Sequence, residues 1–335
     1  MVIDSIFLEI TNRCGKHCDY CYNKLGFIDY NDIPYNVYNS LIRKMQFLGI
    51  DKLTLSGGEP GMHPNFAEFV ELAHKYNIKL RINSNGFTLR KFESLIDQNT
   101  ELQITVDGNK SMHDAYRGEG DYELLLNTIK GIRDNGFRGK ITARYNMHGG
   151  CVDGTVDRIA EVCNDYEQLV DFFALSPVHY PNQKSQLTLL QYKEINKFKE
   201  ELNFSKPSGM RVEIFVPPIS CSIMRNNDNT VYSILIDYNG NVYPCQLCMY
   251  NSLFSLGNII CDDIVSIMTC EKIDNLKRTL QQETKCQVCS IKGICAGGCA
   301  ALNCISPQIK GDGFCKLRKY ILGVKPKFRN YQCWS

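Results

Sequence analysis

Short apolar runs alternate with longer amphipathic stretches through the first half of the chain. The apolar runs are four to six residues long and rich in β-branched and other apolar residues, as the strands of a buried parallel sheet are. The stretches between them are long enough to cross from one parallel strand to the next as helices. The predicted strands are Phe7–Ile10, Lys52–Leu55, Lys79–Ile82, Glu101–Val106, Lys140–Tyr145 and Asp171–Leu175. The predicted helices are Tyr35–Leu48, Asn65–Tyr76, Leu89–Ile96, Tyr122–Asn135 and Val152–Asp165.

This alternation predicts an α/β fold, a partial (β/α)6 barrel like part of a TIM barrel, with function at the carboxyl ends of its strands. After residue 176 the alternation stops, prolines become frequent, and one helix is predicted, Leu189–Leu202. A hairpin follows, with strands Val231–Ile236 and Asn241–Tyr243 around an Asn-Gly turn. The expected parts are a core domain at 1–180, a linker at 181–214 and a cysteine-rich domain at 215–335.

Composition and charge argue against two kinds of partner. The chain has 335 residues, of which 44% are hydrophobic, so it can bury a sizeable core. Its net charge is +2 and it has no block of Lys and Arg, so it lacks the basic surface of a nucleic-acid binder. No segment approaches the ~18 apolar residues of a membrane helix, and the N-terminus does not resemble a signal peptide. We expect a cytoplasmic protein that binds neither a nucleic acid nor a membrane.

The cysteines are numerous and clustered. There are 17, an odd number, and in a reducing compartment they favour metal binding over disulfides. Three lie at residues 14–21, none lies between 22 and 150, and twelve lie from Cys221 onward. Cysteines that only filled the core would be scattered along the chain. Their clustering therefore predicts metal sites.

Three cysteines follow the first predicted strand with the spacing Cys14-x3-Cys18-x2-Cys21. A loop at a strand end lets three thiolates converge on one iron–sulfur cluster, because iron prefers thiolate ligands. A four-iron cluster held in this way keeps one iron without a protein ligand, and that iron can bind a small molecule. A zinc site with His17 as fourth ligand is the alternative, although structural zinc normally uses closely spaced ligand pairs.

These residues resemble the signature of the radical SAM superfamily, C-x3-C-x-aromatic-C, with Tyr20 at the aromatic position. The resemblance implies that the open iron of a [4Fe–4S] cluster holds the amino and carboxylate groups of S-adenosylmethionine (SAM). After the second predicted strand, Gly57 and Gly58 allow close approach of the backbone, and Glu59 is an anion suited to an ammonium group. They resemble the Gly-Gly-Glu motif of the family, which holds the amine of SAM.

The next strand ends are polar and are followed by glycine. By the same resemblance they line the ribose and carboxylate of SAM, and the residues expected there are Asn83, Ser84, Thr105 and Arg144. Ordinary Asn-Gly and Asp-Gly turns and a salt-bridged arginine remain as alternatives. The segment Tyr116-Arg117-Gly118 resembles a recurrent family segment to which no chemistry is assigned.

The carboxy-terminal third has a second cysteine pattern, C-x2-C-x5-C-x3-C with a later cysteine. It resembles the SPASM extension of radical SAM enzymes, whose cysteines ligate two auxiliary [4Fe–4S] clusters, while two zinc sites are the alternative. The resemblance assigns Cys286, Cys289, Cys295 and Cys315 to one cluster, and Cys221, Cys245 and Cys299 to the other, with Cys248 as a candidate fourth ligand. No role is assigned to Cys261, Cys270, Cys304 and Cys333.

Together these resemblances imply an oxidoreductase that cleaves SAM reductively to a 5′-deoxyadenosyl radical. The radical takes a hydrogen atom from a peptide or protein, and a thioether or a carbon–carbon crosslink results. Such an enzyme needs an external electron donor. Because the cluster loop starts at residue 14 with no leader-binding domain before it, we expect a separate leader-binding protein or the barrel itself to recruit the substrate. No protein side chain is assigned a catalytic role.

Three other functions remain open. Sulfatase-maturing enzymes resemble the chain at Tyr243-Pro-Cys245, but their aspartate base is replaced by Gln246, which cannot accept a proton at neutral pH. The second is radical dehydrogenation of a small alcohol or sugar, and the third is a non-catalytic iron–sulfur scaffold. The intact Gly57-Gly58-Glu59 argues against a scaffold, which needs no site for the amine of SAM.

Overall fold

The computed structural model describes residues 2–18, 20–21, 29–147, 155–177, 201, 210–214, 231–269, 271–272 and 275. The chain divides into two compact units. The larger unit is Leu8–Val216, and the smaller one combines Met1–Phe7 with Pro217–Ser335. The first strand therefore contributes residues to both.

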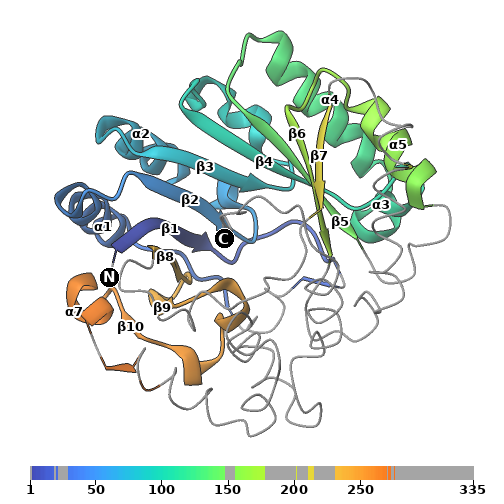
Figure 1. Cartoon of the computed structure of the whole chain (residues 1–335). Helices are drawn as coiled ribbons and strands as arrows, with labels where there is room; N and C mark the ends of the chain where they lie inside the picture. Colours follow the sequence, from blue (N-terminus) through green and yellow to red (C-terminus); the bar gives the residue numbers. More distant parts are fainter. Residues whose placement is uncertain are drawn as a thin grey trace, which may run out of the picture. The chain divides into compact units, whose positions relative to one another are not determined.

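A sheet with helices on its outer side forms the larger unit (Figure 1). Its strand order is β1-β2-β3-β4-β5-β6-β7, and every neighbouring pair from β2 to β7 is parallel. The predicted α/β fold is confirmed. The strands are β1 (Val2–Thr11), β2 (Lys52–Gly57), β3 (Lys79–Ser84), β4 (Thr100–Val106), β5 (Ile141–Met147), β6 (Phe172–Pro177) and β7 (Arg211–Ile214). The helices are α1 (Tyr35–Leu48), α2 (Phe66–Lys75), α3 (Lys110–Arg117), α4 (Asp121–Asp134) and α5 (Thr155–Asp165), with 3-10 helices η2 (Pro60–Met62) and η3 (Leu89–Leu95).

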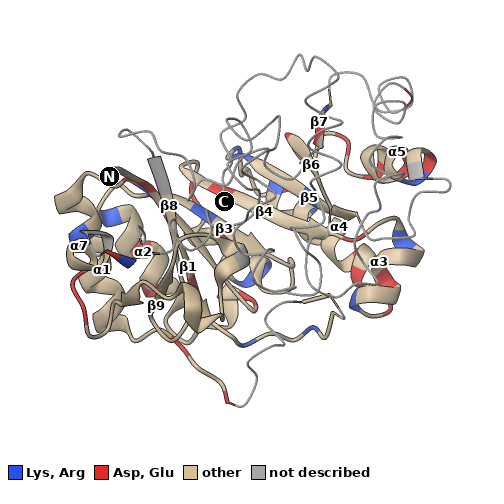
Figure 2. Ribbon diagram, turned by 60° about the horizontal axis from the view of Figure 1, so that its bottom comes forward, with Lys and Arg blue, Asp and Glu red and all other residues tan. Residues whose placement is uncertain are grey.

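The two faces of this sheet differ in polarity. In β3 and β4 apolar residues such as Ile82, Leu102 and Ile104 are fully buried on one face, where a sheet packs against helices. The alternate positions are polar and half-exposed, and the parallel register places Asn83 beside Gln103 on this second face. Figure 2 shows charged residues on the strands themselves. The polar face and its strand ends are thus the part of the sheet suited to a ligand.

Several elements differ from the prediction. The predicted helix Leu89–Ile96 is a 3-10 helix, and its N-cap residue Thr88 makes no capping hydrogen bond because its hydroxyl binds Glu59 instead. Helix α3 was not predicted, and β7 lies inside the predicted linker, where it pairs with β6. Apart from residue 201, the predicted helix Leu189–Leu202 lies outside the described residues.

The smaller unit contains the predicted hairpin. Strands β8 (Val231–Ile236) and β9 (Asn241–Tyr243) are antiparallel, and Gly240 has the positive φ of 82° that their turn requires. The Asp237 carboxylate stabilises the turn by accepting hydrogen bonds from the backbone N–H groups of Asn239 and Asn241, both at 2.9 Å. The other elements are β10 (Gly257–Asn258), α7 (Ile264–Thr269) and the 3-10 helices η6 (Gln246–Cys248) and η7 (Ser252–Phe254).

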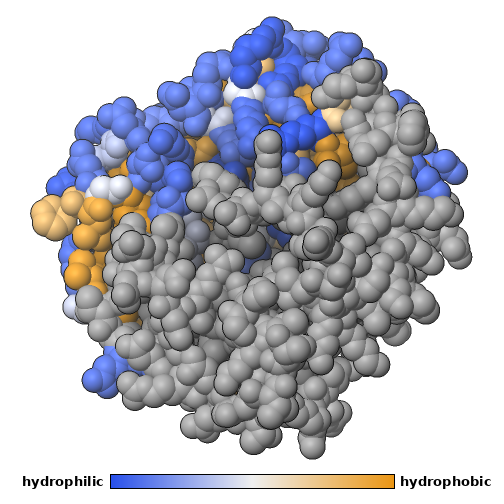
Figure 3. Space-filling model, in the orientation of Figure 1, coloured by the Kyte–Doolittle hydropathy of each residue, from blue (hydrophilic) through white to orange (hydrophobic). Residues whose placement is uncertain are grey.

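The visible surface of the larger unit is mostly hydrophilic (Figure 3). An apolar area lies over α1, at whose C-terminal end Phe47 is 86% exposed. Among the helices that the structure describes, none combines the length and the apolar character needed to cross a bilayer.

Candidate cofactor site

The loop of residues 12–31, called the cluster loop below, carries the three N-terminal cysteines and is closed at its base. The hydroxyl of Thr11 donates to Asp32 Oδ1 at 2.6 Å, and Arg13 Nη2 forms an ion pair with Asp32 Oδ2 at 2.9 Å. Burial alone raises the pKa of Asp32, but the hydrogen bonds from Arg13 and Thr11 and the Arg13 charge hold it below its usual value. The two ends of the loop are therefore tied together where it leaves and rejoins the sheet.

The three cysteines of the cluster loop supply a donor set that fits iron. Cys18 is buried, Cys14 and Cys21 are half-buried, and Cys21 N–H donates to the Cys18 carbonyl at 3.1 Å. In the described part of the chain no group of three Cys, His, Asp or Glu side chains converges on one point. A four-iron cluster takes its thiolates on separate irons, so its ligands need not meet at one point.

One polar side chain lies next to a sulfur of this set. Asn85 Nδ2 lies 3.7 Å from Cys14 Sγ, where its N–H can support a thiolate. Burial raises the pKa of the Cys14 thiol, so an unligated Cys14 favours its neutral form. Iron ligation is what would keep this sulfur as thiolate.

Gly57 and Gly58 bring the end of β2 against the cluster loop. A Cβ on Gly57, whose φ is 139°, would lie 2.1 Å from the Thr11 carbonyl oxygen, and one on Gly58 would lie 2.3 Å from that of Arg13. The backbone N–H of Gly58 donates to Thr11 O at 2.8 Å, and that of Glu59 donates to Arg13 O at 2.7 Å. The close approach that we expected toward a ligand is, in the structure, an approach to the loop that precedes Cys14.

The carboxylate of Glu59 is fully buried beside this contact. Its Oε1 accepts hydrogen bonds from Ser84 Oγ at 2.7 Å and Thr88 Oγ1 at 2.6 Å, and its Oε2 accepts one from Asn85 N–H at 2.8 Å. Burial raises the pKa of Glu59, and the three hydrogen bonds and the more distant charge of Arg117 only partly offset this effect. Glu59 thus joins β2 to the end of β3 and is a buried acidic group within the expected SAM site.

The other residues expected around SAM lie on β3, β4 and β5, with Asn83 and Thr105 near the strand ends and Arg144 in the middle of β5. Asn83 Oδ1 is buried and has no hydrogen-bond partner among the described residues, so it is available to a ligand. Thr105 and Arg144 are register partners on adjacent strands, at half-exposed positions. Ser84 donates to Glu59 and accepts from Gly86 N–H, so its hydroxyl has one acceptor lone pair left for a ligand.

Tyr20 connects the cluster loop to the strand ends. Its hydroxyl donates to Asp107 Oδ2 at 2.5 Å, and Arg117 contacts both Tyr20 and Asp107. Asn146 at the end of β5 donates to Asp107 Oδ1 at 3.0 Å. Burial raises the pKa of Tyr20 well above its usual value, so the phenol stays protonated and acts as a donor. The aromatic residue of the cysteine signature is thus fixed by a hydrogen-bonded network.

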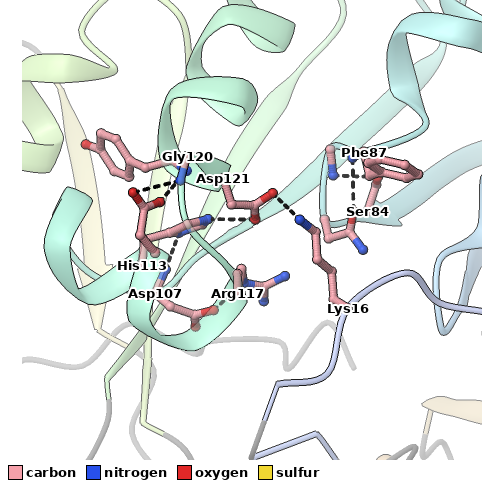
Figure 4. Close-up of polar contacts among 12 residues, drawn as sticks. Lys16, Ser84, Phe87, Asp107, His113, Arg117, Gly120 and Asp121 are labelled. Atoms are coloured by element: carbon pink, nitrogen blue, oxygen red, sulfur yellow. Dashed lines mark hydrogen bonds and ion pairs between the residues drawn. The ribbon is translucent and has the colours of Figure 1, made fainter.

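A second connection runs from Lys16 to Asp121, at the start of α4 (Figure 4). Asp121 also contacts His113 Nε2 at 3.2 Å. The sequence analysis missed these three residues and the role of Arg117. The Tyr116-Arg117-Gly118 segment was noted there without a function, and it is the one sequence signal that points to this region.

Comparison with protein-family models identifies two domains in the chain. Residues 8–163 match the family model of the radical SAM superfamily, and residues 229–291 match the SPASM iron–sulfur cluster-binding domain. The chain contains a radical SAM domain followed by a SPASM domain. The family expected from the cysteine patterns is confirmed, and with it the SAM and [4Fe–4S] cofactors that the two domains imply.

Two named proteins are similar in sequence to this radical SAM chain. The mycofactocin maturase MftC of Mycolicibacterium smegmatis is 22% identical over 315 residues, which are 88% of this chain and 77% of that protein. The sporulation killing factor maturation protein SkfB of Bacillus subtilis is 30% identical over 134 residues, 39% of this chain and 33% of that one. The chain therefore aligns with only about a third of SkfB.

Solved structures support the fold. Streptococcus suis SuiB bound to S-adenosylmethionine has a TM-score of 0.75 and 13% identity, covering 93% of this chain and 76% of SuiB. The structure of SuiB bound to its precursor peptide SuiA has a TM-score of 0.74 and 14% identity, with 93% and 74% covered. At this level of identity the likeness concerns the fold.

The structure describes two of the ligands expected in the SPASM part of the chain. Cys245 is the N-cap residue of η6 and Cys248 is its last residue, and their Sγ atoms are 3.3 Å apart. Cys248 is fully buried. The remaining expected ligands, Cys221, Cys286, Cys289, Cys295, Cys299 and Cys315, lie outside the described residues.

Proposed function

We propose that this radical SAM enzyme is a peptide maturase that installs a thioether or a carbon–carbon crosslink. The observation that carries the proposal is the buried Glu59 carboxylate, which lies next to the backbone contacts joining β2 to the cluster loop. An iron–sulfur scaffold needs no buried acid there, whereas an enzyme that binds the ammonium group of SAM does. The names of MftC and SkfB as maturation proteins, and the precursor peptide bound to SuiB, support a peptide substrate.

In this proposal the chain's own residues bind and orient the cofactors. Cys14, Cys18 and Cys21 hold the first cluster, and Glu59 faces the ammonium group of SAM. When bound, the cluster and SAM supply a radical that takes a hydrogen atom from the substrate. The residues proposed to contact the rest of SAM are Tyr20, Gly57, Gly58, Asn83, Ser84, Thr105 and Arg144.

The SPASM cysteines are proposed to bind two auxiliary clusters. One uses Cys286, Cys289, Cys295 and Cys315, and the other uses Cys221, Cys245, Cys248 and Cys299. We further propose that an external protein donates electrons and that a separate leader-binding protein can deliver the peptide. The high cysteine content, proposed to bind metal rather than to form disulfides, suits the reducing cytoplasm.

The test uses the full chain, reconstituted anaerobically with iron and sulfide and reduced. It is incubated with SAM and a cysteine-containing precursor peptide encoded beside the gene, with its leader-binding protein where one is encoded. We expect 5′-deoxyadenosine to form together with a peptide that has lost two hydrogen atoms, as measured by mass spectrometry. A peptide in which every cysteine is replaced by serine is the control for thioether formation.

Two results would contradict the proposal. Absence of 5′-deoxyadenosine from reduced, cluster-loaded protein would favour the scaffold. Turnover of SAM with oxidation of a small alcohol or sugar, and no change in the peptide, would favour the dehydrogenase.

A further inference from the structure

A continuous path of polar contacts leaves the cluster loop on one side of Cys18 and returns to it on the other. It starts at Lys16 Nζ, which contacts Asp121 Oδ1, and Asp121 Oδ2 contacts His113 Nε2 at 3.2 Å. His113 Nδ1 accepts the backbone N–H of Asp107 at 3.1 Å, and Asp107 Oδ2 accepts the hydroxyl of Tyr20 at 2.5 Å. Lys16 and Tyr20 lie two residues before and two residues after Cys18.

Outside the cluster loop the path consists of Asp107, His113 and Asp121. Arg117 contacts both Asp107 and Tyr20, and these four residues are called the clamp below. All four belong to the segment from the end of β4 through α3 to the first residue of α4 (Figure 4). Three of the four are separated from their cluster-loop partners by about ninety or more positions in the sequence, as in the Lys16–Asp121 contact with a separation of 105. The clamp therefore makes tertiary contacts that fix the cluster loop to the segment between β4 and α4.

The hydrogen bonds of His113 define its tautomer. Because Nδ1 accepts the N–H of Asp107, the ring hydrogen lies on Nε2 and is donated to Asp121. His113 in this state is neutral, so the charge that compensates Asp121 comes from Lys16. The contact between Lys16 and Asp121 is therefore the ion pair of this path.

The clamp is buried and its charges are matched. The side chains of Lys16 and Asp121 are 15% and 4% exposed, and those of Arg117 and Asp107 are 6% and 0% exposed. Among the described residues, Asp121 pairs with Lys16 and Asp107 pairs with Arg117, so each of these carboxylates has a cation beside it. Removing one cation leaves a carboxylate out of water without compensation, which is far more costly than breaking a surface pair.

We propose that the Lys16–Asp121 ion pair is a positioning device for the SAM-binding cluster. It fixes the cluster loop before Cys18, while Tyr20 and Arg117 fix it after Cys18, so that the Cys18 thiol is held from both sides in the orientation that iron requires. Lys16 occupies one of the three free positions between Cys14 and Cys18 in the cysteine signature, so its role is a property of this chain. The inference rests on the proposed function, because it assumes that Cys18 is a cluster ligand.

The experiment compares Lys16→Met, Asp121→Asn and Lys16→Arg with the wild-type chain after anaerobic reconstitution. The matched control is Lys79→Met, because Lys79 forms an ion pair with Asp51 at 2.6 Å that is exposed, with side-chain exposures of 67% and 48%. The readout is the rate at which a chelator removes iron from the SAM-binding cluster. The contribution of the auxiliary clusters is taken from a Cys14→Ala, Cys18→Ala, Cys21→Ala protein and subtracted. Electron paramagnetic resonance of the reduced cluster, with and without SAM, gives an independent signature.

Removal of an outer partner of a metal site typically weakens metal binding about 10–100-fold. We therefore expect Lys16→Met and Asp121→Asn to lose iron from this cluster at least about tenfold faster, with an altered spectrum. Lys16→Arg retains the charge and is expected to keep most of the wild-type behaviour, and Lys79→Met is expected to be unchanged. Because the two residues act as a pair, the double variant Lys16→Met/Asp121→Asn is expected to be no worse than the worse single variant.

Circular dichroism and the unfolding temperature of each cluster-free protein show whether a variant folds. If either single variant fails to fold, the double variant is tested in its place, because it leaves neither charge without its partner. Wild-type rates in the folded Lys16→Met, Asp121→Asn or double variant would overturn the inference, and so would a Lys16→Arg protein as impaired as Lys16→Met. These outcomes leave SAM cleavage by the wild-type protein intact, whereas its absence in the wild type would overturn the proposed function instead.

Discussion

At the scale of single residues, the carboxylate of Glu59 has a tightly constrained position in the site. Two hydroxyls and one backbone N–H donate to it, and burial raises its pKa. These donors all come from the segment at the end of β3, residues 84–88. A buried acid held in this way keeps its orientation when a cationic ligand arrives, because its rotamer is already fixed.

We predict that Glu59→Gln weakens SAM binding without changing the iron content. The Gln side chain keeps an oxygen for Ser84 and Thr88, but its amide nitrogen faces the N–H of Asn85 and carries no charge. Loss of one charge-assisted contact costs about 1.5–3 kcal/mol, roughly a tenfold to hundredfold rise in the Kd for SAM. Equilibrium dialysis of the reconstituted protein measures it.

The control for this substitution is Glu68→Gln, since Glu68 is exposed on α2. Equal SAM affinity in Glu59→Gln and wild type would refute the role of Glu59. Loss of iron in Glu59→Gln would mean that the residue supports the cluster loop rather than SAM.

Sequence patterns at this scale identify residues that neighbour one another in a motif, and they miss partners that are distant in the chain. The cysteine triple, Tyr20 and Gly57-Gly58-Glu59 could be selected because each motif is short and its spacing is specific. Lys16, His113 and Asp121 could not, because a lone lysine or aspartate has no signature and their contact is made only by the folded sheet. Ser84 was selected for SAM, but its proton is donated to Glu59, a contact that the sequence does not reveal.

At the scale of elements, boundaries with strong local signals were predicted well. Helix α1 spans the predicted Tyr35–Leu48 because Pro34 precedes it and Gly49 ends it in the left-handed conformation, with a φ of 69°. Strand β7 has only four residues and lies in a proline-rich region, so its pairing with β6 was not visible in the pattern. Segment η3 has the length of a helix, but the side chain that would cap it serves Glu59.

The turn η6 carries a prediction of its own, that Cys248 is a ligand of an auxiliary cluster. The turn brings Cys248 N–H within 3.0 Å of the Cys245 carbonyl and the two sulfurs within 3.3 Å of each other. A four-iron cluster takes its thiolates on separate irons, so the two sulfurs would move apart to bind one cluster, and the turn already places both at the same site. We expect Cys248→Ala to lower the iron content and to change the spectrum of an auxiliary cluster.

Cys261→Ala is the matched control, because Cys261 is an exposed cysteine of the same unit. Full iron content and an unchanged auxiliary spectrum in Cys248→Ala would exclude ligation. That cluster would then keep an open iron suited to a substrate thiolate, which would favour thioether formation.

At the scale of the whole molecule, the expected metal sites are distributed between the two units. The three N-terminal cysteines, Glu59 and the clamp all belong to Leu8–Val216. Cys245 and Cys248 belong to the unit that contains Pro217–Ser335, as do all the other expected auxiliary ligands. No expected cluster thus draws protein ligands from both units, so each unit is expected to load its own clusters.

We therefore predict that the chain with Cys14, Cys18 and Cys21 all replaced by alanine loses SAM cleavage and keeps the auxiliary iron. With three four-iron clusters, the iron content is expected to fall from about twelve to about eight per chain, because only the first cluster loses its ligands. Iron and sulfide analysis with a 5′-deoxyadenosine assay measures both effects, and Cys163→Ala, a buried cysteine of α5 outside every expected site, is the control. Continued release of 5′-deoxyadenosine by the triple variant would refute the assignment of the SAM-binding cluster. Loss of nearly all iron would instead show that the auxiliary clusters depend on the first one, against independent loading of the two units.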